Sequence, residues 1–240
     1  TTASGEASTA MGYSTTASTQ ASTSMGKNTT ASGSISTAMG WFTTASGDTS
    51  TAMGGSTTAS GSRSTAMGSG TTASGYVSTA MGKYTIASDF ASLVIGQYNS
   101  SGHSVTNNQT SFSTSNTAFV IGNGTSGSLS DAFKVMFNGD TTVSNDLTVS
   151  GDVVISSDAR LKSNIESLGS TLPKLLQIDG KSYEIKGKQK IGVLAQEIKE
   201  VFPELVSEDD NEMLAVNYQG LVPVLINALK EQDEKMKEQE

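Results

Sequence analysis

Small polar and apolar positions alternate along the first part of the chain with a fixed period of fourteen residues. The unit TTASGxxSTAMGxx begins at Thr1 and recurs six times, and the last copy, TIASDFASLVIGQY from Thr85, is degenerate. A short fixed period is typical of solenoids, in which each unit buries its apolar positions only against its neighbours. The pattern predicts seven stacked coils over residues 1–98, and it needs no catalytic pocket to explain it.

Each unit divides into the halves TTASGxx and STAMGxx. We expect five residues of each half to form a short strand, and the glycine with the two variable residues to form a corner. The fourth position of the second half is a column of larger side chains, Met11, Met25, Met39, Met53, Met67, Met81 and Ile95. A coil lined by alanine buries too little apolar surface to hold one chain together alone. We therefore expect this column to pack against other copies in a homotrimer.

The repeat resembles the left-handed parallel β-roll of trimeric autotransporter adhesin heads, whose units carry S-x-A-I-G and A-x-G motifs. Here the larger residue is usually Met, and Thr19 and Asp89 replace the corner glycine of the first half. The alternative is a disordered Ser/Thr/Gly tract, which the strict register disfavours. At the variable corners, Trp41 and Phe42 are candidates for contact with a cell-surface glycan or protein receptor, although the corners can equally be exposed without a role.

The composition of the chain excludes several classes of function. The 240 residues carry a formal net charge of −8 and 35% hydrophobic residues, with Gly 25 and Cys 0. The acidic balance argues against a nucleic-acid partner, no apolar run is long enough for membrane insertion, and disulfides and thiolate metal sites are excluded. We expect no cofactor and no metal. Since the chain starts in register with its first repeat, we expect it to be cut from a longer protein.

The middle segment, 99–156, has a different pattern. From Thr117 the chain reads TAFVIGNGTSG and then AFKVMFNGDTTVSNDLTVSGDVVISS, in which Asn138-Gly139 and Ser150-Gly151 separate runs rich in Val, Phe and Thr. Such punctuation predicts strands joined by tight turns. The segment looks like the β-stranded shaft that precedes the terminal domain of many phage tail fibres and tailspikes.

The last segment, 157–240, carries the candidate chemistry. SSDARLKSNI begins at Ser156, IGVLAQEI follows at Ile191 and LAVNY at Leu214. This ordered set resembles the intramolecular chaperone domain of endosialidase-type tailspikes and tail fibres, a family of self-cleaving serine peptidases also found in myelin regulatory factors. The resemblance implies a trimeric assembly module that folds the fibre ahead of it and then cuts itself off before the serine of S-D-x-R-L-K. Carried onto this chain, the nucleophile is Ser157, the base is Lys162 and the cleaved bond is Ser156–Ser157.

The residue types suit these roles. A serine needs a neighbouring base, and a lysine can serve when burial or nearby cations disfavour its charged form. One turn can bring Ser157 and Lys162 together, with Asp158, Arg160 and Asn164 as supporting residues. Backbone N–H groups or Arg160 can steady the oxyanion.

Two alternatives to this assignment stay open. Asp158 can instead cap a helix that starts at Ala159, which would leave Arg160 and Lys162 as ordinary solvated charges. Ser156 is a competing nucleophile.

The remaining pattern predicts an α+β domain. A short helix is expected over 171–178, strands over 182–186 and 189–195, a helix over 196–202, and strands over 205–207 and 213–217 around the acidic turn 208–212. That turn lacks the spacing of an EF-hand calcium loop, so a solvated hairpin tip is the expectation.

A final helix is predicted after the hairpin. It carries a heptad seam of Tyr218, Val222, Leu225, Leu229, Gln232 and Met236. We expect i to i+4 pairs between Glu231 and Lys235 and between Asp233 and Lys237, with Pro223 in the first turn. The alternative is an amphipathic helix packed on its own domain.

Together these features predict a mainly β homotrimeric fibre with a β-roll head, a β shaft and a C-terminal self-cleaving chaperone. The expected function is a viral, bacteriophage-type tail fibre or receptor-binding protein, located in the virion and in the host cytoplasm during assembly. The alternative is a bacterial trimeric surface adhesin whose terminal domain only trimerises. Glycan hydrolysis by the head is disfavoured, because Glu6, Asp48 and Asp89 lie on separate corners.

Overall fold

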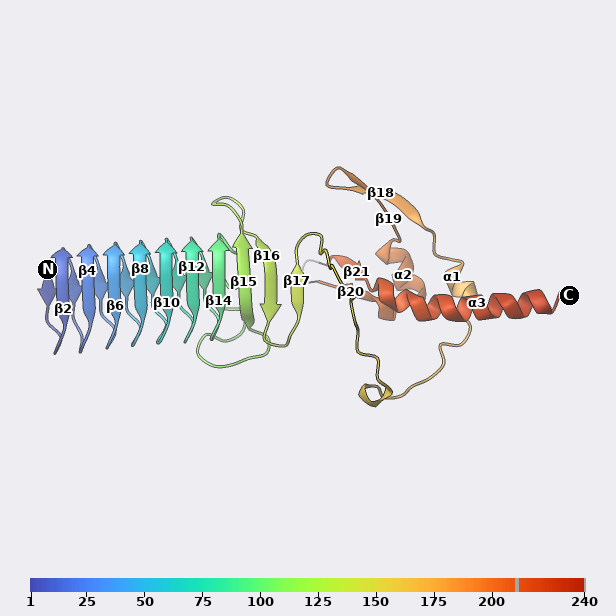
Figure 1. Ribbon diagram of the computed structural model, residues 1–240, viewed down its shortest axis with the longest axis horizontal. Coiled ribbons are helices and arrows are strands. Elements are labelled where there is room, and N and C mark those ends of the chain that lie inside the picture. Colours follow the sequence, from blue (N-terminus) through green and yellow to red (C-terminus); the bar gives the residue numbers. More distant parts are fainter. Residues whose placement is uncertain (210–211, 240) are drawn as a thin grey trace. The chain divides into compact units, whose positions relative to one another are not determined.

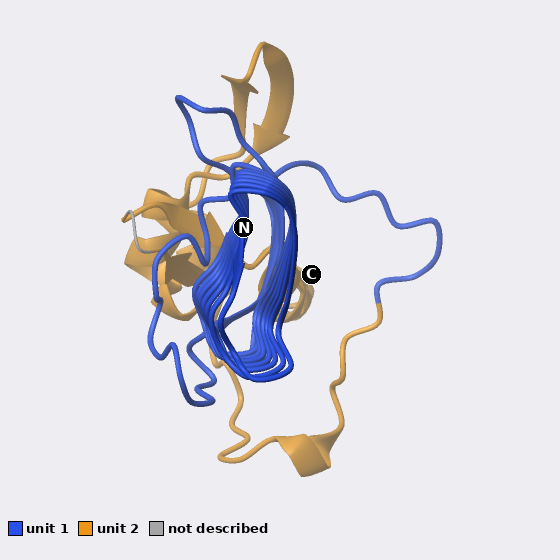
Figure 2. Ribbon diagram, turned by 90° about the vertical axis from the view of Figure 1, so that its left-hand side faces the viewer, with its two compact units in different colours: residues 1–153 blue, residues 154–240 orange. Residues whose placement is uncertain are grey.

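The computed structural model describes residues 1–209 and 212–239 and divides into two compact units, residues 1–153 and 154–240 (Figures 1 and 2). The contacts therefore do not separate a head ending at residue 98 from a shaft over 99–156. Among the described residues, no helix is both long and apolar enough to cross a membrane.

The first unit is a β-solenoid in which each fourteen-residue coil adds one strand to each of two parallel sheets. One sheet holds seven two-residue strands: β1 (Thr2–Ala3), β3 (Thr16–Ala17), β5 (Thr30–Ala31), β7 (Thr44–Ala45), β9 (Thr58–Ala59), β11 (Thr72–Ala73) and β13 (Ile86–Ala87). The other holds five-residue strands: β2 (Thr9–Tyr13), β4 (Thr23–Lys27), β6 (Thr37–Trp41), β8 (Thr51–Gly55), β10 (Thr65–Ser69), β12 (Thr79–Lys83) and β14 (Leu93–Gln97). Seen from the end in Figure 2, the coils superimpose, which confirms the predicted solenoid.

Alternation along each strand decides what the coil buries. In the five-residue strands the alanine points inward and the methionine outward, so Ala38 is fully buried whereas Met39 stays half-buried. The core is consequently a column of alanines, which continues into Val94 and Val120. The methionine ladder lies on the outer face of the sheet, where another molecule can reach it; its packing against other copies stays a prediction.

The corners differ from the expectation. In the first six coils the glycine of the second half lies inside a strand, at φ between 117° and 124°, and a Cβ there would come 1.9–2.1 Å from a carbonyl oxygen of the next coil. The left-handed corner residues are the variable ones, including Ile35, Phe42 and Val77. The prediction that glycine supplies the corner freedom is therefore wrong for this half, because close stacking of coils, and not the turn, requires the glycine.

The solenoid continues beyond residue 98. Strand β15 (Thr117–Asn123) pairs parallel with β14, with Ile95 opposite Ile121, and the antiparallel strands β16 (Asp131–Met136) and β17 (Thr141–Val143) complete a ten-stranded sheet. The loop between β14 and β15 ends the other sheet, since the Asn99 side-chain amide bonds both the N–H and the carbonyl of Ile86 at 2.9 Å. The sequence TAFVIGN is thus an additional coil strand and not the start of a separate shaft.

The predicted shaft forms only in part. The turn at Asn138-Gly139 joins β16 to β17 as expected, but residues 144–158 contain no strand, and Val154 is 88% exposed. β structure in this segment requires a neighbouring strand with which it can pair.

The second unit has the predicted α+β order. It contains α1 (Leu172–Leu175), the hairpin of β18 (Lys181–Ile185) and β19 (Lys188–Gly192), α2 (Ala195–Val201), the hairpin of β20 (Val206–Glu208) and β21 (Leu214–Val216), and α3 (Leu221–Lys237), with 3-10 turns η1 (Ala159–Leu161), η2 (Pro203–Leu205) and η3 (Tyr218–Gly220). Ile198, Phe202 and Val224 form its core. The acidic turn includes Asp210 and Asn211, which lie outside the described residues.

Helix α3 carries two stripes. Val224 and Ala228 are buried against the unit's own core, whereas the predicted seam is exposed, with Leu229 at 70%. Pro223 lies in the first turn, and the Asp233–Lys237 ion pair forms. The Glu231–Lys235 pair does not form: the Glu231 carboxylate instead accepts hydrogen bonds from the backbone N–H groups of Thr171 and Leu172. The helix therefore packs on its own domain and leaves the seam free.

Candidate functional site

Ser157 and Lys162 meet through a side-chain hydrogen bond. The Nζ of Lys162 donates to the Oγ of Ser157 at 2.7 Å. The 3-10 turn Ala159–Leu161 stands between them and is closed by the Leu161 N–H on the Asp158 carbonyl and the Lys162 N–H on the Ala159 carbonyl, both at 3.1 Å. One turn therefore brings the two side chains into contact, as the spacing predicts.

Asp158 stabilises this turn from its N-terminal side. Its Oδ1 accepts the Arg160 backbone N–H at 2.9 Å, and its Oδ2 accepts the Arg160 Nη2 at 2.6 Å. The hydrogen bonds from Arg160 lower the pKa of the Asp158 carboxyl, and the same pairing raises the pKa of Arg160. Asp158 thus caps a short 3-10 helix, as the alternative expects, and the contact between Ser157 and Lys162 forms beside this cap.

The contact is exposed to solvent. Residues 144–170 are exposed, including Leu161 at 73% and Ile165 at 68%. Within the second unit, the segment 154–170 lies apart from the packed helices (Figure 1). Asp158, Arg160 and Leu161 line a shallow hollow of about 300 Å³. The geometry of the pair is therefore present, whereas the burial that makes a lysine a base is not.

The other candidates lie outside this contact. Ser156 makes no side-chain hydrogen bond within the described residues, and neither does Asn164, which adopts a left-handed φ of 52° after the turn. The Arg160 guanidinium is engaged by Asp158 through both Nε and Nη2. Of the two expected oxyanion donors, the arrangement therefore favours backbone N–H groups over Arg160.

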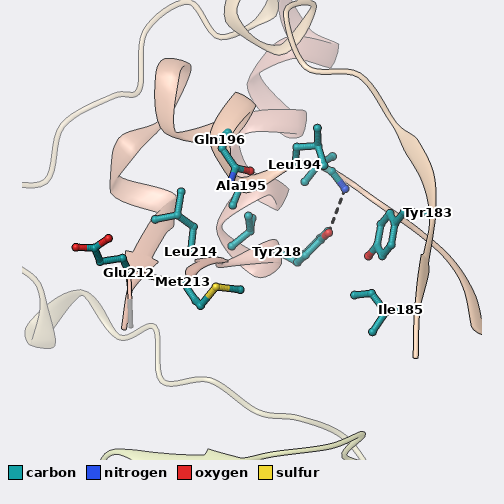
Figure 3. A pocket seen from close by; sticks show the side chains of 11 residues that line it. Tyr183, Ile185, Leu194, Ala195, Gln196, Glu212, Met213, Leu214 and Tyr218 are labelled. Atoms are coloured by element: carbon teal, nitrogen blue, oxygen red, sulfur yellow. Dashed lines mark hydrogen bonds between the residues drawn. The ribbon is translucent and has the colours of Figure 1, made fainter. Parts of the chain in front are cut away.

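A larger cavity of about 550 Å³ lies elsewhere in the second unit, between the β18–β19 hairpin, the start of α2 and β21 (Figure 3). Its lining is mostly apolar, from Tyr183, Ile185, Leu194, Met213 and Leu214, and the Tyr218 hydroxyl accepts the Val193 N–H at 3.1 Å. Sequence reasoning did not find it, because its walls come from elements that no local pattern connects. No group of His, Asp or Glu in the described part of the chain has the geometry of a metal site.

In the head, the predicted receptor residues are at the surface. Trp41 is 53% exposed and meets Phe42 edge to face, with ring centroids 4.8 Å apart. Trp41 ends β6 and Phe42 follows it at the corner, so both rings lie outside the alanine core of the solenoid.

A solenoid of short, nearly identical coils, followed by an α+β unit with an exposed amphipathic helix, is an architecture that fits fibre-like or adhesin-like proteins. The comparisons with known families agree. Residues 157–207 match the family of the chaperone of endosialidase, whose model bears the name of a peptidase, and five overlapping stretches between residues 3 and 85 match the YadA head domain repeat. The chain joins YadA head repeats to a chaperone of endosialidase domain. No match was found among curated proteins or solved structures.

Proposed function

We propose that this chain is part of a homotrimeric attachment fibre, of the kind that bacteriophages carry, and that its second unit directs trimerisation and then cuts the Ser156–Ser157 bond. The observation that carries the proposal is the 2.7 Å contact between Lys162 Nζ and Ser157 Oγ inside the segment that matches the chaperone of endosialidase family. The virion, with the host cytoplasm during assembly, is the location that follows from this role.

The proposed chemistry uses these two side chains. Lys162 in its neutral form takes the proton of the Ser157 hydroxyl, and Oγ attacks the carbonyl carbon of Ser156. The C–N bond breaks, Lys162 returns its proton to the nitrogen, which leaves as the α-amine of Ser157, and an ester joins Ser156 to the Ser157 Oγ. Water then hydrolyses the ester, which restores the hydroxyl and releases a carboxylate at Ser156.

Trimerisation supplies what the single chain lacks. Leu161 and Ile165 flank the pair and are exposed, as are Val154 and Ile155 before the scissile bond. Covering these side chains with other copies removes water from the pair, which lowers the pKa of a buried lysine and favours its neutral form. Cleavage is then coupled to assembly, because only an assembled site has a base.

The exposed seam of α3 supports the same assembly. Val222, Leu225 and Leu229 are at least 46% exposed, although the opposite stripe of the helix is buried. Apolar positions spaced four and three residues apart form the contact surface of helices that pack against each other. We infer that this seam and the outward methionine ladder of the head are the two main contacts between subunits.

Removal of the assembly unit would make the fibre kinetically stable. Three interwoven chains unfold slowly, and without the unit that guided folding the reverse route is lost. This gives a physical reason for a peptidase that acts once, on its own chain.

The test is intact mass under denaturing conditions together with native mass. The parent chain should yield fragments 1–156 and 157–240, and the native particle should contain three copies of each. Ser157→Ala should remain full length, and so should Lys162→Arg, which keeps the charge but cannot lose its proton. Ser156→Ala is the matched control and should still be cut. Equal cleavage in Ser157→Ala and the parent would exclude the proposed nucleophile.

A second candidate is a bacterial trimeric adhesin whose terminal unit assembles the fibre without cutting it. The head repeats and the exposed seam fit this function equally well. A trimer that remains full length after prolonged incubation would favour it, whereas two fragments per chain would exclude it.

A further inference from the structure

One corner row of the solenoid differs in chemistry from the rest of the surface. The row consists of the last residue of each five-residue strand and the residue that follows it. These strands are the even-numbered ones from β2 to β14, and the row lies at their arrow tips in Figure 1. Its large members, which we call the aromatic edge, are Tyr13, Lys27, Trp41, Phe42, Lys83, Tyr84 and Tyr98. The row contains no acidic residue, although the chain has a net charge of −8, whereas the opposite corner row carries Glu6 and Asp48.

The rings of this edge are held in place. Tyr84 and Tyr98 stack with centroids 5.0 Å apart, and Trp41 meets Phe42 edge to face. Lys83 lies 6.0 Å above the Tyr98 ring, and Lys27 lies 5.9 Å from the Tyr13 ring. Because each coil is in register with the next, these contacts run in line along the edge and form a preorganised surface.

Two coils with only small residues interrupt the row. Gly55 and Ser56 follow the Trp41 coil, and Ser69 and Gly70 follow them. The Trp41 ring extends over Gly55, and the Tyr84 ring lies against Gly70 from the other side. Since adjacent strands are about 4.8 Å apart, the backbones of Trp41 and Tyr84 stand about 14 Å apart, and the two rings lean toward each other over the glycines between them. The result is an edge on which two aromatic residues flank the hydroxyls of Ser56 and Ser69, while Lys27 and Lys83 lie beyond them with their amines by the Tyr13 and Tyr98 rings.

We propose that the aromatic edge binds an acidic oligosaccharide, with sugar rings packed on Trp41 and Tyr84, hydroxyls bonded to Ser56 and Ser69, and acid groups paired with Lys27 and Lys83. Aromatic faces accept the apolar faces of sugar rings, and two lysines without a nearby carboxylate in the row attract an anion. This inference rests on the proposed attachment role and is independent of the cleavage chemistry.

Trp41 is the only tryptophan of the chain, so its emission reports directly on this edge. Titration of the full chain with hyaluronan and polygalacturonate fragments should give a saturable change in Trp41 emission, weaker at high salt and weaker still with neutral maltohexaose. Tyr84→Ser and Lys83→Ser should each reduce the affinity at least tenfold. The matched control is Tyr76→Ser on the opposite corner row, which should bind as the parent does.

Two results would overturn the proposal. The first is the absence of a saturable change with both acidic sugars; the second is an equal affinity in Tyr84→Ser and Tyr76→Ser. If Tyr84→Ser instead lowers the native mass, the edge is a contact between subunits and not a sugar site. Denaturing mass on the same samples follows cleavage separately, so a failure here is distinguishable from a failure of the proposed peptidase.

Discussion

The hydroxyl of Ser24 lies 2.7 Å from the hydroxyl of Thr29 where the second coil of the head passes into the third, and both side chains are fully buried. At the position of Ser24 the other coils have alanine, except the last, which has Val94, and the threonine hydroxyls that follow the alanines, Thr15, Thr43, Thr57, Thr71 and Thr85, have no hydrogen-bond partner. The head thus contains one buried threonine hydroxyl with a hydrogen-bond partner and five without one. The effect of this hydrogen bond on stability can therefore be measured by comparing coils of the same protein.

This difference predicts opposite effects of two single-atom changes. Ser24→Ala should destabilise the head by about 1 kcal/mol, because it leaves Thr29 buried without a partner. Ala52→Ser should stabilise it by a similar amount, because the new hydroxyl reaches Thr57. Thermal unfolding followed by circular dichroism measures both. Ala59→Ser, on the opposite wall of the coil, is the control and should not stabilise; if all three changes act alike, the pairing is irrelevant.

Coil stacking depends on the glycines inside the five-residue strands. Gly40 has φ 123°, and a Cβ there would lie 2.0 Å from the Gly54 carbonyl oxygen. Gly40→Ala should therefore cost at least about 1–3 kcal/mol from backbone conformation alone, with the clash in addition. Gly127→Ala is the control, because nothing lies within 4 Å of its added Cβ. Comparable melting temperatures for the two variants would contradict the stacking argument.

Asp158 is expected to act on cleavage by positioning the turn. Asparagine keeps the N-terminal cap but loses the ion pair with Arg160, whereas alanine loses both. Cleavage should therefore be slower in Asp158→Asn and slowest in Asp158→Ala, with the same pH dependence of the rate as the parent. A shifted pH–rate profile would instead make Asp158 part of the proton transfer. Densitometry of the two fragments over time supplies the rates.

The two stripes of α3 are expected to separate folding from assembly. Leu229→Lys places a charge on the exposed seam and should lower the native mass from trimer to monomer while the unit stays folded. Val224→Ala removes buried volume and should reduce the stability of the second unit by about 2 kcal/mol without a change in native mass. Lys230→Glu is the control for added charge. A Leu229→Lys trimer would exclude the seam as a subunit contact.

Glu231 links α3 to the start of α1 in a pH-dependent way. Hydrogen bonds from the Thr171 N–H and the Ser170 hydroxyl lower the pKa of the Glu231 carboxyl below its ordinary value of 4.5. A carboxyl with a lowered pKa in the folded state contributes stability above its unfolded pKa, and this contribution is lost as the pH falls through the folded value. The free energy of unfolding of the second unit should therefore fall less between pH 5 and the pH of acid unfolding in Glu231→Gln than in the parent. Glu234→Gln is the control, and its free energy of unfolding should depend on pH as in the parent.

Local patterns predict what is local in this protein. The fourteen-residue period defines the coils, because each strand residue pairs with the residue fourteen positions further along the chain. The period therefore predicts which residues are in contact. The five-residue spacing of Ser157 and Lys162 is similar: a single turn capped by Asp158 closes it. The hairpins and helices of the second unit also follow from patterns within a few residues.

Contacts between residues far apart in the sequence could not be predicted from the local sequence pattern. The sequence favoured a pair between Glu231 and Lys235, but the N–H groups at the start of α1, about sixty residues away along the chain, bind the carboxylate instead. Orientation within the coil was equally hidden, since alternation separates Ala38 from Met39 without saying which one the coil encloses.

By itself, the sequence determined the coil period, the order of elements and the turn that joins Ser157 to Lys162, because each depends on neighbours along the chain or on exact repetition. Only the tertiary structure decided that alanine fills the solenoid, that Asn99 ends one sheet, and that α3 buries Val224 while Leu229 stays exposed. These depend on which surfaces meet in space, and burial is a property of the packed chain and not of the residue.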